Sequence, residues 1–160
     1  MLNVTLICVG KMREKHYIAA FNEYEKRLGA FCRFTLAELP EQRLPERPVQ
    51  KEIDAALEKE ARAILEHVPK GAALIAMCVE GKSMSSETLA HRFTEWQNAG
   101  VSRLCFVVGG SFGLHDSVKQ AAQLKLSMSE MTFPHHLARV MLMEQIYRAC
   151  TINAGTQYHK

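Results

Sequence analysis

The chain has 160 residues, of which 48% are hydrophobic and 23% charged, and it carries a formal net charge of +3. This size and composition fit one globular domain, residues 1–160, with an ordinary core. The weak basic balance permits contact with nucleic acid but is smaller than in dedicated nucleic-acid binders. No apolar run approaches the roughly 20 residues that a membrane span requires, and Leu2 to Val9 is too short for the apolar part of a signal sequence.

The five cysteines form no Cys-x-x-Cys motif, and their number is odd. Cys8, Cys78 and Cys105 fall inside apolar segments, where a thiol acts as a small buried hydrophobic group. We therefore expect reduced, structural cysteines and a cytoplasmic location.

Apolar, strand-like segments alternate with segments of helical periodicity along the whole chain. In order, the prediction is a strand at Asn3–Val9, a helix at Glu14–Leu28, a strand at Cys32–Leu39, a helix at Lys51–His67, a strand at Ala72–Val79, a helix from Ser85 or Ser86 to Asn98, a strand at Leu104–Val108, a helix at about 115–123, a strand at about 124–128 and a helix at about 136–153. This alternation implies an α/β fold with a parallel sheet that is covered on both faces. Ligands of such sheets bind at the carboxyl ends of the strands.

The segment from Leu39 to Val49 contains three prolines together with Arg43 and Arg47. Such a composition is typical of a mobile loop. A solvated connector is the favoured interpretation, and a nucleic-acid contact is the alternative.

Gly109-Gly110-Ser111-Phe112-Gly113 follows the fourth predicted strand. It lacks the G-x-G-x-x-G spacing of dinucleotide-binding loops, and no acidic residue ends a strand about 20 residues later. A nicotinamide site is therefore disfavoured. Glycines still allow close backbone approach and expose N–H groups, which suits an adenosine or a carboxylate. A tight strand-to-helix turn without a ligand is the alternative.

The last predicted helix is apolar around most of its circumference, so one face should be buried by more than its own sheet. A homodimer explains this economically. Glu144 and Arg148 lie four residues apart and predict an intrahelical ion pair. His135 and Arg139 lie near the start of the helix, where an anion is favoured. Adjacent His135 and His136 point about 100° apart, which disfavours their sharing a metal ion, so no metal is predicted.

The tail from Gln157 to Lys160 contains Tyr158 and His159. An aromatic ring beside basic groups can stack on a base and touch a phosphate. Its terminal position nevertheless favours fraying.

Several motifs together resemble the SPOUT methyltransferases, and most closely the ribosomal RNA large subunit methyltransferase H family. The resemblance covers the whole chain. The motifs that carry it are Val9-Gly10-Lys11, Val107-Val108-Gly109-Gly110-Ser111-Phe112-Gly113-Leu114, Leu126-Ser127-Met128-Ser129-Glu130-Met131-Thr132-Phe133-Pro134-His135, Glu144-Gln145-Ile146-Tyr147-Arg148-Ala149 and Tyr158-His159.

The resemblance implies a homodimeric parallel-sheet α/β knot, in which the C-terminal part forms a trefoil knot around S-adenosylmethionine. It implies methylation of N3 of a pseudouridine in 23S ribosomal RNA, in a stem-loop at the subunit interface of assembled 70S ribosomes. The contacts that it implies for the cofactor are Met77, Gly109, Met128, Ser129, Glu130, Met131, Thr132 and Phe133. The residues that it implies on the RNA side, and as catalytic candidates, are His135, Arg139, Tyr158 and His159.

Two other kinds of protein have the same pattern of elements. One is a non-enzymatic RNA- or ribosome-binding protein on the same fold, and the other is a flavodoxin-like nucleotide-binding enzyme. The first should give no heat with S-adenosylmethionine, and the second should bind flavin or NAD instead.

Overall fold

The computed structural model describes residues 1–160, with five strands and five helices in strict alternation. The strands are β1 (Leu2–Val9), β2 (Cys32–Leu39), β3 (Ala73–Lys82), β4 (Arg103–Val108) and β5 (Leu124–Leu126). The helices are α1 (Lys15–Leu28), α2 (Gln50–His67), α3 (Ser86–Asn98), α4 (Asp116–Ala121) and α5 (His135–Ala154). The predicted order and type of every element are confirmed. The largest differences in bounds are that β3 is longer than predicted, whereas α4 and β5 are shorter.

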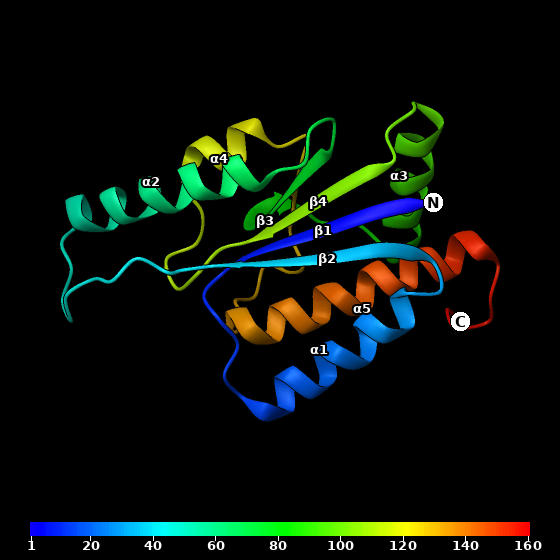
Figure 1. Ribbon diagram of the computed structural model, residues 1–160, viewed down its shortest axis with the longest axis horizontal. Coiled ribbons are helices and arrows are strands. Elements are labelled where there is room, and N and C mark those ends of the chain that lie inside the picture. Colours follow the sequence, from blue (N-terminus) through cyan, green and yellow to red (C-terminus); the bar gives the residue numbers. More distant parts are fainter.

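The sheet has the strand order β2-β1-β4-β3-β5, and every pair of neighbours is parallel. Helices α1, α3 and α5 cover one face, whereas α2 and α4 cover the other (Figure 1). The predicted parallel sheet with two covered faces is therefore confirmed. All five strands end at the same edge of the sheet, which brings the loops that follow them together.

The central strands β1 and β4 are apolar along their length because both of their faces are buried. Val4, Leu6 and Cys8 of β1 point into the core beneath α1, α3 and α5. Ile7 and Val9 point into the second core, beneath α2 and α4. Such strands read as continuous apolar runs rather than as alternating patterns.

The end of β3 makes an unusually close contact with β5. The β3–β5 pairing is interrupted by a bulge between Met77 and Lys82, and both of these residues pair with Leu126. A Cβ added to Gly81 would lie 2.8 Å from backbone atoms of Leu126, so only glycine lets the two chains approach this closely. The Ser127 N–H donates to the Lys82 carbonyl across 3.0 Å. The chain that leaves β5 is thus held against the curved end of β3. The trefoil knot implied by the resemblance stays a prediction.

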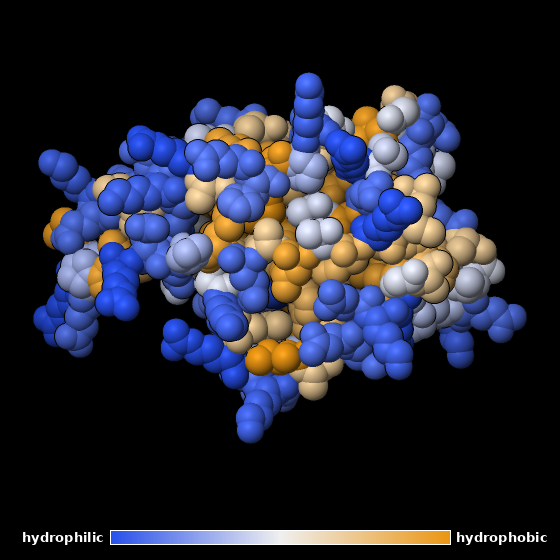
Figure 2. Space-filling model, viewed as in Figure 1, coloured by the Kyte–Doolittle hydropathy of each residue, from blue (hydrophilic) through white to orange (hydrophobic).

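Hydrophilic residues make up most of the periphery in the space-filling view, whereas hydrophobic residues show in the central part of this face (Figure 2). None of the helices combines the length and the apolarity that crossing a membrane requires.

Candidate active site

A cavity of about 520 Å³, here called the cofactor cavity, lies where β3, β4 and β5 end. Three segments form most of its wall: the end of β3, the turn after β4 and the loop between β5 and α5. Glu130 is exposed and does not line it. The predicted cofactor residues that do line it are Met77, Gly109, Met128, Ser129, Met131, Thr132 and Phe133.

The turn that follows β4 is a tight backbone loop. The Gly113 N–H donates to the Gly110 carbonyl across 3.1 Å, and Gly113 has a φ of +79°, a conformation that favours glycine. A Cβ on Gly109 would lie 2.4 Å from the Gly113 carbonyl oxygen. Glycine at position 109 therefore allows the turn to close on itself, and it leaves backbone rather than side chain at this part of the wall.

The loop between β5 and α5 has no regular secondary structure, but its own side chains fix its shape. The Ser127 hydroxyl donates to the Ser129 carbonyl across 2.9 Å, and the Ser129 hydroxyl accepts from the Met131 N–H across 3.1 Å. Met128 and Phe133 give this side of the cavity an apolar character. An apolar wall opposite exposed backbone is suited to a ligand with a flat ring and polar substituents.

The ion pair between Lys119 and Glu80 also lines the cofactor cavity and was not predicted. The hydrogen bond from Lys119 lowers the pKa of the Glu80 carboxyl below its usual value. The position of Glu80, directly after the predicted third strand, could have indicated it. Lys119 gave no such signal because it lies on the short helix α4, which the sheet places beside the cavity.

His135 is the first residue of α5 and lines the cofactor cavity. Burial, followed by the nearby charge of His136, lowers the pKa of His135 below 6.5. The ring of His136 packs edge-on against it at 4.3 Å, and its Nδ1 lies 2.8 Å from a Glu14 carboxylate oxygen. No three His, Cys, Asp or Glu side chains gather as metal ligands would.

Arg139 does not face the cofactor cavity but lies wholly buried one turn farther along α5. Its guanidinium donates to Glu38 across 2.8 Å and to the Gly10 carbonyl across 3.0 Å, while its Nε has no partner. Glu38 also accepts from the Met12 N–H across 3.3 Å. Arg139 thus ties α5 to the ends of β1 and β2. Its predicted contact with RNA stays a prediction.

Removing either partner of this buried ion pair should lower the free energy of unfolding, but by unequal amounts. Glu38→Ala leaves a guanidinium with no exposed surface and one carbonyl partner, so we expect a loss of about 3 kcal/mol or more of unfolding free energy. Arg139→Met should cost less, because the Glu38 side chain is 28% exposed and can be hydrated. Urea denaturation of both variants measures the difference. Equal losses, or a larger loss for Arg139→Met, would contradict this account.

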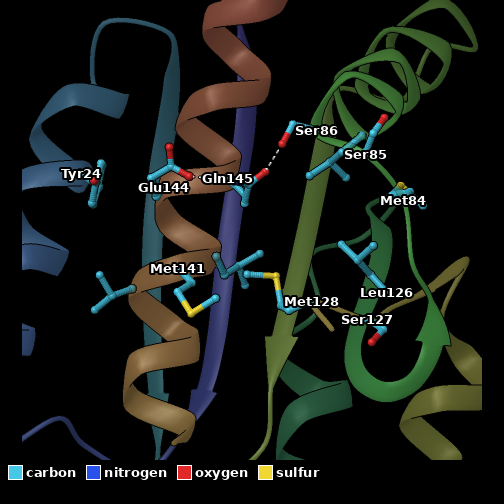
Figure 3. A pocket seen from close by; sticks show the side chains of 13 residues that line it. Tyr24, Met84, Ser85, Ser86, Leu126, Ser127, Met128, Met141, Glu144 and Gln145 are labelled. Atoms are coloured by element: carbon cyan, nitrogen blue, oxygen red, sulfur yellow. Dashed lines mark hydrogen bonds between the residues drawn. The ribbon is translucent and has the colours of Figure 1, made fainter. Parts of the chain in front are cut away.

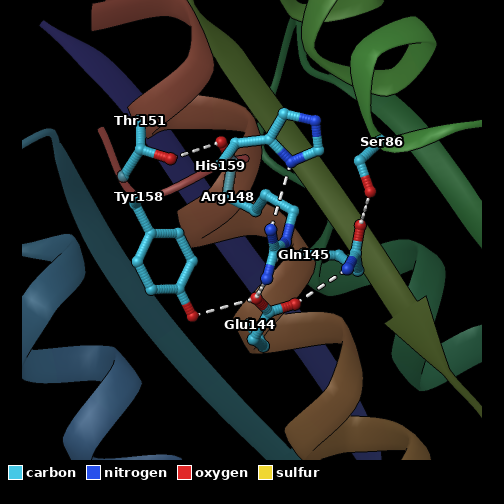
Figure 4. Close-up of polar contacts among 7 residues, drawn as sticks. All are labelled: Ser86, Glu144, Gln145, Arg148, Thr151, Tyr158 and His159. Atoms are coloured by element: carbon cyan, nitrogen blue, oxygen red, sulfur yellow. Dashed lines mark hydrogen bonds and ion pairs between the residues drawn. The ribbon is translucent and has the colours of Figure 1, made fainter. Parts of the chain in front are cut away.

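The C-terminal tail packs against α5, so the prediction of a frayed tail is wrong (Figure 4). The Tyr158 ring packs edge-on against Tyr147 at 4.7 Å, and its hydroxyl donates to Glu144 across 3.1 Å. Burial and Glu144 raise the pKa of Tyr158 to about 12, so the hydroxyl stays a donor. The Glu144–Arg148 ion pair, at 2.6 Å, confirms the i,i+4 prediction.

His159 completes this network. Its Nδ1 lies 3.1 Å from an Arg148 guanidinium nitrogen, and its Nε2 lies 2.8 Å from a Glu87 carboxylate oxygen. Of the four predicted catalytic residues, only His135 lines the cofactor cavity. The chain alone therefore does not bring the four together.

A family profile described as "Predicted SPOUT methyltransferase" matches residues 2–159. A solved structure, described as a probable methylase family protein from Haemophilus influenzae Rd KW20, covers 99% of this chain with a TM-score of 0.54. The chain covers 70% of that protein, at 12% identity, so this likeness concerns the fold alone. The α/β fold with a cavity at the strand ends is that of the SPOUT methyltransferase class, to which the profile assigns the chain.

Curated relatives narrow the assignment. Proteins named ribosomal RNA large subunit methyltransferase H from Bifidobacterium animalis subsp. lactis and Clostridium novyi are 44% and 45% identical over 159 residues, 99% of this chain and 100% of each relative. A protein from Methanococcus maripaludis named putative ribosomal RNA large subunit methyltransferase H is 42% identical over the same share of both chains. The chain belongs to the ribosomal RNA large subunit methyltransferase H family.

Proposed function

We propose that the protein transfers a methyl group from S-adenosylmethionine to N3 of a pseudouridine in 23S ribosomal RNA. The target lies in a stem-loop at the subunit interface of assembled 70S ribosomes, which places the protein in the cytoplasm. Family membership supports the class of reaction. The observation that carries the proposal for this chain is the cofactor cavity, whose wall contains nearly all of the residues that the family motifs assign to cofactor binding.

The cofactor cavity has apolar side chains and exposed backbone, which match the adenine ring and the polar groups of S-adenosylmethionine. Met77, Met128 and Phe133 supply an apolar wall for the adenine ring, and the Gly109–Gly113 turn supplies backbone for polar groups. When bound, this cofactor supplies a methyl group that its sulfonium already activates. The protein's own residues then have to orient the two reactants, and good alignment contributes about 7–11 kcal/mol toward such reactions.

His135 is the side chain best placed to receive the proton of the pyrimidine N3–H. It lines the cavity, and its lowered pKa keeps the imidazole neutral and able to accept a proton at neutral pH. The Tyr158 and His159 side chains of a second subunit are proposed to complete the RNA side of the site.

This role predicts a defined pH dependence. Because the pKa of His135 is lowered, the neutral base persists above pH 6.5, and we expect kcat to fall only as the pH drops below that value. His135→Gln should lower kcat by about 10²-fold and remove this acid limb. Steady-state methylation of unmodified ribosomes between acidic and neutral pH measures both effects. If kcat of the variant still fell at low pH as in the wild type, a group other than His135 would be responsible for the fall.

The protein is proposed to work as a homodimer that pairs through α5. Apolar side chains of α5, including Val140 and Met141, line a hollow of about 510 Å³, together with Met84 and Leu126 from other elements (Figure 3). Val140 and Leu126 are already buried at the bottom of this hollow, whereas Met84 and Met141 are only partly buried in a single chain, and a second copy would cover them. Sedimentation measurements test this assembly.

A non-enzymatic ribosome-binding protein on the same fold is the alternative. Titration calorimetry with S-adenosylmethionine separates the two functions, because only the enzyme is expected to bind it. Mass mapping of 23S rRNA from cells with and without the gene then tests the position and the chemistry of the methyl group. Cells lacking the gene should lose one methyl group on one pseudouridine, and an unchanged map would overturn the proposal.

A further inference from the structure

A third cavity, of about 800 Å³ and here called the basic cavity, adjoins the cofactor cavity. The loop after β1 contributes Lys11 and Arg13, the loop after β2 contributes Glu41 and Arg43, and the start of α5 contributes His135 and His136. The two loops meet because β1 and β2 are parallel neighbours that end together. All but one of the residues that line this cavity are polar, charged, glycine or proline.

Its three permanent cations are free to bind a ligand. Lys11, Arg13 and Arg43 are exposed, and none of them forms an ion pair with a carboxylate. By contrast, the lysine of the cofactor cavity, Lys119, is paired with a glutamate. The basic cavity therefore concentrates uncompensated positive charge at the edge of the proposed site.

Two carboxylates also reach this cavity, and both are already engaged. Glu38 is held by the buried guanidinium of Arg139. One Glu41 oxygen accepts a hydrogen bond from the Ser111 N–H of the glycine turn across 3.0 Å. Arg139 therefore compensates the charge of Glu38, whereas Glu41 keeps its charge and is held against the glycine turn. The three exposed cations outnumber this one carboxylate, so an incoming anion meets a net positive charge.

The frame beneath the cavity is fixed by contacts with the rest of the fold. Arg139 donates to the Gly10 carbonyl, and Glu38 accepts from the Met12 N–H, so the loop is anchored on both sides of Lys11 and directly before Arg13. Helix α5 begins at His135 with no acidic residue in its first turn and no side-chain cap, which leaves N–H groups at its N-terminus. A helix of 20 residues adds a favourable potential for an anion there.

We propose that the basic cavity binds a backbone phosphate of the RNA substrate through Lys11, Arg13 and Arg43. This inference rests on the proposed function. His135 lines both cavities, so a phosphate held here sets the neighbouring nucleotide beside the cofactor cavity. The contacts fix position rather than sequence, because phosphates carry no base identity.

An acidic protein surface is the competing ligand, and the lining favours RNA. Protein interfaces gain most of their affinity from apolar and aromatic anchors at a desolvated centre. The basic cavity offers a single hydrophobic side chain and several separate cations, an arrangement that suits phosphate oxygens.

The test uses the full-length protein and ribosomes purified from cells that lack the gene. Binding of Lys11→Ala, Arg13→Ala and Arg43→Ala is measured at several salt concentrations between about 50 and 200 mM. Each variant should bind severalfold more weakly, and the slope of log K against log salt should become shallower by about 1. Arg47→Ala is the matched control, because Arg47 lies in the same loop as Arg43 but does not line the cavity. Variants that behave like this control would overturn the proposal.

A separate crosslinking experiment identifies whether the basic cavity contacts RNA or protein. A photoreactive benzoylphenylalanine at position 43 should crosslink to 23S rRNA on the same ribosomes, and a crosslink to ribosomal protein alone would overturn the RNA assignment. Calorimetry with S-adenosylmethionine should give the wild-type affinity for all three variants, because their positions lie outside the cofactor cavity. If the wild-type protein shows the salt and crosslinking results without methylating the ribosomes, the proposed function fails and the phosphate site stands.

Discussion

Gly109→Ala is expected to weaken binding of S-adenosylmethionine by about 10²-fold or more while the protein still folds cooperatively. The added Cβ would lie 2.4 Å from the Gly113 carbonyl oxygen and 2.6 Å from its carbonyl carbon. Gly109 does not have a positive φ, so the effect is steric rather than a backbone strain of residue 109 itself. Because the atoms in the way belong to the backbone, they cannot rotate aside. The turn has to open, and the wall of the cofactor cavity moves with it.

Two matched variants isolate this effect. A Cβ on Gly110 would lie 2.6 Å from a Glu41 carboxylate oxygen, the end of a flexible side chain that can swing away, so Gly110→Ala should lose much less affinity. Gly100, after α3, has a φ of +86° and no atom within 4 Å of an added Cβ. Gly100→Ala should therefore cost about 1–2 kcal/mol of stability without changing cofactor affinity. Calorimetry with S-adenosylmethionine, together with thermal melting, gives both quantities. Equal affinities of the Gly109 and Gly110 variants would show that the turn does not shape the cofactor site.

The sequence was sufficient to predict the layered fold because each element carries its own local signal. The central strands are buried on both faces, so their apolar runs are continuous, and the helices show periodic apolar faces. The cofactor cavity followed from one further rule, that parallel strands end at one edge of the sheet. This rule indicated that the Gly109–Gly113 turn and the loop after the fifth strand would lie at one edge of the sheet. Met77 and the individual contacts between Met128 and Phe133 were implied by the family resemblance, and not by this rule.

The contacts that sequence reasoning did not predict are those between residues far apart in the chain. Arg139 pairs with Glu38, 101 positions away, so its local spacing gave only its place on α5. The strand order that sets β1 beside β2, and so creates the basic cavity, is also not encoded in any single segment. The tail was expected to fray because composition does not reveal that Tyr147 and Glu144 offer it a ring and an acceptor.

Deletion of the last three residues, from Tyr158 onward, is expected to leave S-adenosylmethionine binding intact and to lower methyl transfer by about 10²-fold or more. The tail makes no contact with the cofactor cavity of its own chain. Tyr158 bonds to Glu144, nine residues after His135, which corresponds to about 13 Å along the axis of α5. If Tyr158 and His159 act on the RNA beside His135, they must come from the other subunit of a dimer. Unchanged turnover of the truncated protein on ribosomes would remove the tail from the mechanism.

A mixed dimer shows whether each active site uses the tail of its own chain or the tail of the partner subunit. One subunit carries Gly109→Ala, which disables its cofactor cavity, and the other lacks residues 158–160. The two are co-expressed with different affinity tags and isolated together. If the tail acts across the dimer, the truncated subunit binds the cofactor and receives the intact tail of its partner, which leaves one complete site of two and about half of the wild-type rate. If the tail acts on its own chain, no complete site exists and the mixed dimer stays as inactive as either parent.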